Sequence, residues 1–256
     1  MISPLWGSLV LMVGGRAGYS LYHRPLSKRA AFNLEDLASP TASDRVLVFS
    51  PHQDDETLAA GGYIASSVKS GASVSVVLVT DGNRRGLEYV REDEFIQATG
   101  ALGVPEDNLI FLNYPDGKLK TLDREALKEK LSSLVGQFNP TIILSPHPND
   151  YNKDHSVIGS LISELTSGKS LPVYFYLVHY PHFPVPVDYA PNLYLLPPRR
   201  LFRAGGDWRI FMLSQEIEDE KKRAVDEYKT QLGNPFIQGL LLSMIRKNEI
   251  FLIKGN

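Results

Sequence analysis

The chain has 256 residues, a formal net charge of -2 at pH 7 and no cysteine. Hydrophobic residues make up 43% and charged residues 22%, which is ordinary globular usage and excludes both a disordered chain and a wholly membrane-embedded one. The near-neutral charge argues against a nucleic-acid partner. Without cysteine there are no disulfides and no thiolate ligands, so any metal must be held by histidines and carboxylates. The length fits one large domain.

The first 43 residues differ from the rest in composition. Residues 2–21 are apolar apart from Arg16, and basic residues follow them. This layout resembles a membrane anchor that leaves the domain on the cytoplasmic side. Because Gly14, Gly15 and Arg16 interrupt the apolar run, the alternative is an ordinary helix or strand packed on the domain. We therefore expect an N-terminal segment and linker over residues 1–43, with membrane association through residues 2–21 as one interpretation, and a cytoplasmic domain over residues 44–256.

Short apolar runs alternate with helical patterns along the domain. The runs predict strands over residues 46–49, 73–79, 108–112, 141–144, 173–178 and 250–253. Helices are predicted directly after the first strand, over residues 88–102, around residues 127–138, and over residues 216–231 and 236–245. Strands that alternate with helices predict right-handed βαβ units. The expected fold class is α/β, a Rossmann-like three-layer sandwich with a mostly parallel central sheet and the site at the C-terminal edge of the strands.

Polar side chains follow two of these strands directly. His52, Asp54 and Asp55 come after the first, and a second cluster from His147 to His155 follows the strand at 141–144. Catalytic zinc uses three protein ligands and leaves a position for water. His52 and Asp55 are suited to chelate one ion, with a third ligand from the second cluster. The alternative is that the acids cap helices and the histidines are structural, an interpretation that two similar strand ends weaken.

These motifs resemble the PIG-L (LmbE-like) family of zinc-dependent de-N-acetylases. The His-Gln-Asp-Asp-Glu run at 52–56 is similar to the first family signature, with Gln53 in place of a proline, and residues 150–155 are similar to the second. The likeness extends over roughly residues 44–252. The resemblance implies a hydrolase that removes acetyl from an N-acetylglucosamine-type substrate, either a small molecule or a glycoconjugate. It also implies Zn²⁺ held by His52, Asp55 and His155, with a metal-bound water as nucleophile and Asp54 as general base.

Further roles rest on the resemblance and on position at the same sheet edge. Arg91, Asp116, Asn152 and His179 are expected to contact the substrate, although Arg91 could instead pair with Glu94 and the Pro-Asp-Gly run at 115–117 is by itself a turn signal.

Position 152 departs from many family members, which have a histidine there. Asparagine cannot deliver a proton, so another group must protonate the leaving amine. The candidates are His147, which we favour, His179, and Asp54 returning the proton it has taken. The alternative for His147 is a histidine that positions its loop.

Two other functions remain open from the sequence. A metal-dependent phosphoesterase also uses His and Asp ligands, but such sites often hold two metals. A carbohydrate-binding or scaffold module without activity would account for the missing histidine. A nucleotide-binding Rossmann domain is disfavoured, because no Gly-x-Gly-x-x-Gly follows the first strand.

Overall fold

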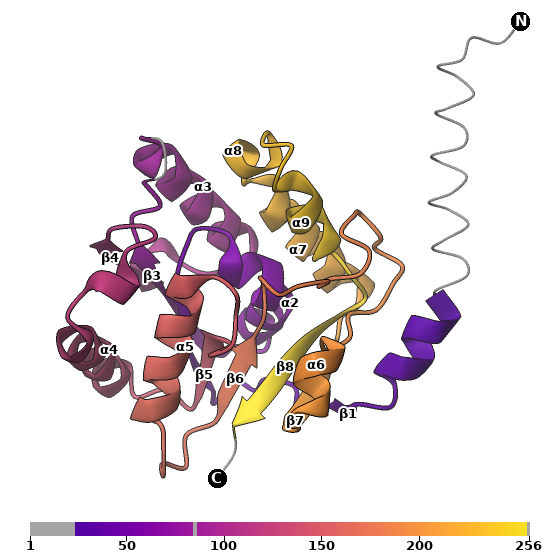
Figure 1. The fold of residues 1–256 in the computed structure, drawn as a ribbon, viewed down its shortest axis with the longest axis horizontal. Coiled ribbons are helices and arrows are strands. Elements are labelled where there is room, and N and C mark those ends of the chain that lie inside the picture. The colour runs from indigo at the N-terminus through magenta and orange to yellow at the C-terminus, as the bar shows by residue number, and fades with distance from the viewer. Residues whose placement is uncertain (1–23, 84–85, 255–256) are drawn as a thin grey trace, which may run out of the picture.

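The computed structural model describes residues 24–83 and 86–254. The residues of the predicted anchor, 2–21, lie outside these ranges. Within them, one mixed sheet of eight strands is flanked by helices (Figure 1). The strands are β1 (Glu35–Asp36), β2 (Arg45–Ser50), β3 (Ser73–Thr80), β4 (Leu109–Tyr114), β5 (Ile142–Pro146), β6 (Val173–Tyr176), β7 (Asp207–Met212) and β8 (Asn248–Lys254).

The helices lie mostly between consecutive strands, as expected for βαβ units. Residues 24–31 are helical, and the later helices are α2 (Asp55–Lys69), α3 (Glu88–Ala101), α4 (Arg124–Phe138), α5 (Lys153–Leu165), α6 (Arg199–Arg203), α7 (Gln215–Asp226), α8 (Lys229–Leu232) and α9 (Gln238–Ser243). Two short 3₁₀ helices, η1 (Glu106–Asn108) and η2 (Leu119–Thr121), flank β4. Among the described residues, no helix combines the length and the apolar character that crossing a membrane requires.

The strand order is β1-β7-β8-β6-β5-β2-β3-β4. All pairs from β6 to β4 are parallel, whereas β8 runs antiparallel to both of its neighbours, β6 and β7. The predicted α/β class and mostly parallel sheet are thus confirmed. The carboxyl ends of β2, β5 and β6 meet at one edge, and this is where the polar clusters lie.

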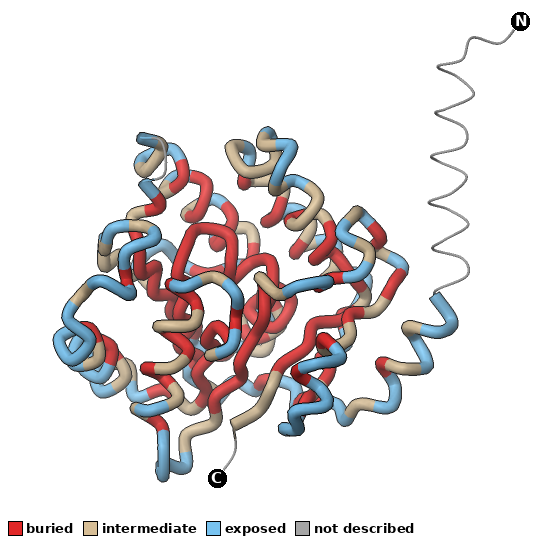
Figure 2. The backbone as a smooth tube through the Cα atoms, in the orientation of Figure 1, coloured by how far each residue is buried: buried red, intermediate tan, exposed pale blue. Residues whose placement is uncertain are grey.

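Buried residues are concentrated in the strands and in the adjoining parts of the helices (Figure 2). Alternation along β2 separates the core into two layers. Val46 and Val48 of β2 pack into the cluster that contains residues of α2, α3 and α7, whereas Leu47 and Phe49 pack into the cluster that contains residues of α4 and α5. Because successive strand residues point to opposite faces, one strand serves both cores. The molecule is therefore a three-layer sandwich of helices, sheet and helices.

Three features near the chain ends were not predicted. β7 was missed because its sequence, Asp-Trp-Arg-Ile-Phe-Met, mixes charged and apolar residues; in the fold it lies between β8 and β1, and Trp208 and Ile210 are buried. The helix expected over 216–231 is divided, with α7 ending at Asp226 and α8 starting at Lys229. β1 lies within the predicted N-terminal region of residues 1–43 and pairs with β7, and the domain boundary at residue 43 stays a prediction.

Candidate metal centre and active site

The turn between β2 and α2 directs consecutive side chains in different directions. Asp54 has a φ of 116°, which is unusual for a residue other than glycine and is held only where surrounding contacts require it. The backbone N–H of His52 donates to Asp55 Oδ2 at 2.9 Å, which closes the turn. Asp54 occupies the N-cap position of α2 but its side chain makes no capping hydrogen bond. The helix-cap interpretation is therefore wrong for Asp54.

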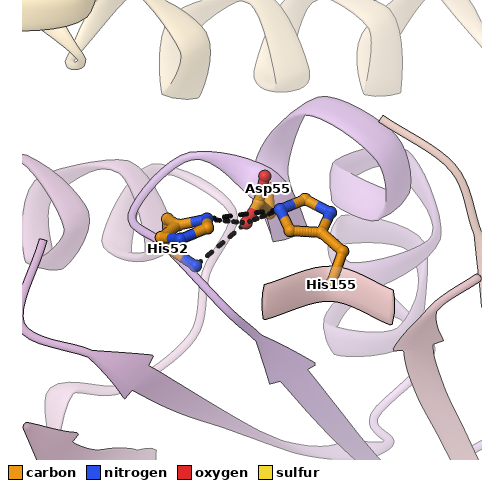
Figure 3. A group of neighbouring side chains, drawn as sticks. All are labelled: His52, Asp55 and His155. Carbon is orange, nitrogen blue, oxygen red and sulfur yellow. Dashed lines mark hydrogen bonds and ion pairs between the residues drawn. The ribbon is translucent and has the colours of Figure 1, made fainter. Parts of the chain in front are cut away.

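Three side chains from two strand ends converge at the start of α2 (Figure 3). His52 Nδ1 lies 3.2 Å from Asp55 Oδ2 and 3.2 Å from His155 Nε2, and His155 Nε2 lies 2.9 Å from Asp55 Oδ2. Zinc ligands at ~2.0–2.1 Å from a tetrahedral ion lie roughly 3.3 Å from one another, so the observed separations fit such an ion closely. His52, Asp55 and His155 are thus a group that could hold a metal.

Three further carboxylates lie at the outer nitrogens of the histidine rings. Asp116 Oδ1 lies 3.3 Å from His52 Nε2. Asp154 Oδ2 lies 3.2 Å from His52 Nε2 and also accepts from the backbone N–H of Gly117 at 2.7 Å. Asp150 Oδ2 lies 3.3 Å from His155 Nδ1. Carboxylates on the outer nitrogen of a ligating histidine fix the ring and raise its basicity. The inner nitrogens, His52 Nδ1 and His155 Nε2, are left facing Asp55.

The pKa values of His52, His155 and Asp55 are set by the burial of these side chains and by their contacts with neighbouring charged groups. Burial lowers the pKa of His52, but the carboxylates of Asp116, Asp154 and Asp55 outweigh it and raise this pKa well above the usual value. Burial likewise opposes protonation of His155, yet Asp55 and Asp150 raise its pKa to about 9. Although burial raises the pKa of Asp55, the two histidines hold it well below its usual range. A metal must therefore displace protons from the two rings to bind there.

Asp54 has a different environment from the adjacent Asp55. Burial, together with the neighbouring carboxylate of Asp55, raises the pKa of Asp54 to about 8, and the positive charge of Arg91 only partly offsets this. A carboxyl group with a pKa near neutrality is suited to take up and release a proton. A bound cation would lower this pKa.

A cavity of about 390 Å³ opens beside the group. Its walls contain the predicted residues His52, Asp54, Asp55, Arg91, Asp116, Asn152 and His179. His155 lies behind them, fully buried in the first turn of α5. The structure therefore brings together nearly all the residues that the sequence placed in the site.

Arg91 lines the cavity, but its guanidinium group is held mainly by hydrogen bonds to backbone carbonyls of the protein. Its NH1 and NH2 groups donate to the backbone carbonyls of Gly82 and Gln53 at 3.0 and 3.1 Å, and NH1 lies 3.8 Å from Asp116 Oδ2. Glu94 accepts hydrogen bonds from Thr230, so the predicted alternative pairing of Arg91 with Glu94 is not what the structure shows. The guanidinium thus holds the turn that carries Asp54, and its contact with substrate stays a prediction.

Asn152 and His179 both face the cavity. Asn152 is the N-cap of α5, where its Oδ1 accepts from Asp154 N at 2.9 Å. The other predicted contact, His179, has its ring centroid 5.0 Å from that of His155. Burial, with the positive charge of His155, lowers the pKa of His179. Asn152 thus supplies an amide donor, while His179 is disposed to be a neutral imidazole.

His147 lies away from the cavity. Its ring stacks on Trp208, with centroids 5.7 Å apart, and its Nδ1 accepts from the backbone N–H of Asn149 at 2.9 Å. Burial lowers its pKa to about 4. These contacts agree with the alternative considered from the sequence, in which His147 positions the loop after β5. They do not support the proton-donor role expected for His147.

Sequence reasoning missed one wall of the cavity. It is formed by the segment from α8 to α9 and contains Thr230, Gln231, Asn234, Phe236, Ile237, Leu240 and Leu241. No motif marks these residues as functional, because the fold alone brings them across from the metal group. The orienting roles of Asp150 and Asp154 were also missed, although both lie within the second motif.

The fold and the site define an α/β protein with a buried His-Asp-His group at the carboxyl edge of its sheet. Residues 47–166, which contain all three of these residues, match the model of the PIG-L family, described as GlcNAc-PI de-N-acetylase. This segment, a little under half of the chain, is thus similar to the PIG-L (LmbE-like) family, and the relatives that follow are named as deacetylases of GlcNAc-type compounds.

Individual relatives are distant. A Bacillus cereus protein named probable N-acetyl-alpha-D-glucosaminyl L-malate deacetylase 2 is 28% identical over 135 residues, which is 48% of this chain and 60% of the relative. A probable N-acetylglucosaminyl-phosphatidylinositol de-N-acetylase of Dictyostelium discoideum is 26% identical over 49% of this chain and 51% of that protein. The matched segment thus spans between half and two thirds of these relatives.

Among solved structures, N,N'-diacetylchitobiose deacetylase of Pyrococcus horikoshii superposes with a TM-score of 0.61 at 20% identity. The superposition covers 86% of this chain and 87% of that one, so the common fold extends well beyond residues 47–166. At this identity the likeness establishes the fold.

Proposed function

We propose that this protein is a zinc-dependent hydrolase that removes the acetyl group from an N-acetylglucosamine-type substrate. The observation that carries the proposal is the position of Asp54. It lies beside the His52-Asp55-His155 group, takes no part in capping α2, and lines the same cavity. A purely structural cluster would not require a residue with a strained backbone whose carboxyl group faces a cavity and makes no helix-capping hydrogen bond.

Zinc held by His52, Asp55 and His155 would act as a Lewis acid that polarises the acetyl carbonyl and lowers the pKa of water. Asp54 is placed to take the proton of the attacking water, since it adjoins the metal group without belonging to it. Asn152, with its Oδ1 engaged by the backbone, can direct its N–H₂ toward a substrate oxygen. Asp116 and His179 complete the wall around the reacting amide.

The leaving amine needs a proton, and the two histidines proposed for this from the sequence are poorly suited. Burial lowers the pKa of His147 and also that of His179, so both are weak bases that carry little charge at neutral pH. We therefore propose that Asp54 returns to the amine the proton it has taken from water. His179 then binds the substrate as a neutral donor or acceptor. His147→Ala and His179→Ala are both expected to retain a kcat within about tenfold of wild type, and a loss of 10²-fold or more in either would assign the acid to that residue.

The test of the proposal is a screen of N-acetylglucosamine conjugates for acetate release by zinc-loaded protein. Conjugates with malate, inositol phosphate and a second sugar cover small molecules and glycoconjugates. Acetate release is expected from at least one of them and is expected to stop on chelation. Asp54→Asn is the matched control, because it keeps the size of the side chain and removes the base.

Other outcomes would point elsewhere. Tight binding of a conjugate by zinc-containing protein without acetate release would identify a binding module. Two metals per chain with phosphate release from phosphoesters would identify a phosphoesterase. A second group, His52, Asp116 and Asp154, could also hold a metal ion and shares His52 with the first group. The number of metal ions per chain therefore distinguishes the two enzyme classes. We expect one zinc per chain, since Asp154 is already bound by backbone N–H groups.

A further inference from the structure

A second and larger cavity is lined by residues of the helix at 24–31 and of the long segment that follows β6. Its volume is about 840 Å³, within the roughly 300–1,000 Å³ typical of ligand sites. Leu26 and Ala30 of the helix form one wall, and Phe183, Leu193 and Leu195 belong to the other. Among the described residues that line it there is no Asp or Glu. The walls therefore suit an apolar guest.

The rim of this cavity is basic. Arg199 and Arg200, at the start of α6, line it, and both side chains are exposed. Neither forms an ion pair with a described residue. Because arginine binds phosphate strongly and no carboxylate competes at the cavity, the rim complements an anionic group on the guest.

Exposed apolar side chains line the cavity or adjoin residues that line it. Leu26 and Val185 line it and are 54% and 60% exposed, and Phe202, between the arginines and the end of α6, is 51% exposed. Phe32, also exposed, packs edge-on against the lining residue Tyr194 at 6.0 Å. Exposed apolar side chains near basic ones are typical of a surface that meets lipid.

The apolar character of the cavity walls favours a hydrocarbon chain over a peptide as the bound ligand. A peptide would bury backbone amides that apolar walls cannot satisfy, at a cost of several kcal/mol in an apolar medium, whereas a hydrocarbon chain has no polar group to satisfy. We propose that this cavity takes one hydrocarbon chain of an anionic phospholipid, with Arg199 and Arg200 contacting its phosphate.

The proposal places the candidate active site next to the bound lipid. Val178 and His179 line the site cavity, and the next two residues, Tyr180 and Pro181, line the lipid cavity. A lipid held there would keep the site close to a membrane surface. The lipid cavity itself is independent of the deacetylase activity proposed above.

The test measures extraction of a lipid chain and uses the full chain. The probe is phosphatidylglycerol with a pyrene-labelled acyl chain in phosphatidylcholine vesicles, where extraction raises monomer emission. The wild type is expected to extract one labelled lipid per chain. Ala30→Trp, which fills the cavity from a partly exposed position, is expected to weaken extraction at least about tenfold. Asn33→Trp is the matched control, because it adds the same ring just past the same helix and outside the cavity.

A second pair of variants tests the rim. Arg199→Gln with Arg200→Gln is expected to weaken extraction of phosphatidylglycerol roughly 30-fold, whereas Arg203→Gln, on the same helix but outside the cavity, is expected to leave it unchanged. Far-UV circular dichroism and Tm verify that each variant is folded. No extraction by the wild type, or extraction that Ala30→Trp leaves unchanged, would overturn the proposal. The second result would assign lipid binding to another segment, residues 1–23 included. Equal extraction of labelled phosphatidylcholine would overturn the role of the arginines.

Discussion

Two groups of buried charged side chains lie against α2, one at its start and one at its middle, and they differ in charge balance. At the middle, Lys221 and Glu249 form a pair with Nζ and Oε1 2.6 Å apart, and Glu249 also accepts from Gly62 N and Tyr63 N. At the start of the helix, five carboxyl groups face two imidazoles and one guanidinium, from Asp54, Asp55, Asp116, Asp150, Asp154, His52, His155 and Arg91.

This difference separates a structural charge cluster from a functional one. The pair of Lys221 and Glu249 is 1% and 0% exposed and matches one charge with one charge, so it needs no further partner. The group at the start of α2 has an excess of carboxyl groups and opens into a cavity. Such an excess suits a divalent cation, whose charge would compensate it. Four predictions test this contrast.

The largest effect is expected on removing a metal ligand. His155→Ala takes away one of three converging donor atoms, so zinc content and acetate release should both fall to background. Metal analysis of the purified protein and the acetate assay check this. Chelation of the wild type should give the same loss, and zinc should restore activity to the wild type alone. Full activity in His155→Ala would show that this group is not the metal site.

Asp54→Asn should lower kcat by about 10²–10⁴-fold, because the general base is lost while the metal ligands stay in place. Zinc content should stay at the wild-type level, which distinguishes this variant from His155→Ala. Steady-state kinetics on the conjugate identified in the screen measures the effect. A loss of zinc equal to the loss of rate would instead make Asp54 a structural support of the turn.

Lys221→Met should lower the free energy of unfolding by about 3–5 kcal/mol, because it leaves the carboxylate of Glu249 buried without its cation. Urea denaturation measures this. The double variant Lys221→Met with Glu249→Gln buries no charge and should recover part of the loss. While the protein is folded, kcat should be unchanged. A drop in kcat with normal stability would mean that this balanced pair also serves the site.

The smallest effect is expected from an orienting carboxylate. Asp154→Asn keeps Oδ1 as the acceptor for Leu119 N but replaces Oδ2, which accepts from Gly117 N and contacts His52, with an amide nitrogen, so zinc affinity should fall by about 10–100-fold. Competition with a chromogenic chelator measures it. Asp123→Asn, a carboxylate that only caps α4, is the matched control and should leave zinc affinity unchanged.

Local sequence predicted the site residues where polar side chains directly follow an apolar run that forms a strand. The apolar runs that became β2, β3, β4, β5, β6 and β8 are short and continuous, and this pattern predicts buried strands without knowledge of their partners. The same reasoning placed His52, Asp54 and Asp55 at the carboxyl edge, because they directly follow such a run. β7 was not recognisable in this way, since its pattern has meaning only beside β8.

In the site, too, some features were predictable from the sequence and others depend on tertiary packing. The identities of His52, Asp55 and His155 as a candidate ligand set, and of Asp54 as a nearby base, come from the sequence and its family resemblance. Long-range packing decided which histidine is excluded: Trp208, 61 positions after His147, stacks on its ring and holds it away from the cavity. Packing also supplied the wall from Thr230 to Leu241 and the apolar cavity behind residues 24–31.

The sequence by itself determined the fold class, the edge of the sheet that carries the site and the residue types available to a metal, because these depend on local periodicity and on motifs a few residues long. Only the tertiary structure decided the contacts between segments 100 or more residues apart, such as His52 with His155 and Glu56 with Tyr228. The physical reason is that burial, charge compensation and ring orientation are properties of the packed environment. No single stretch of the chain contains that environment.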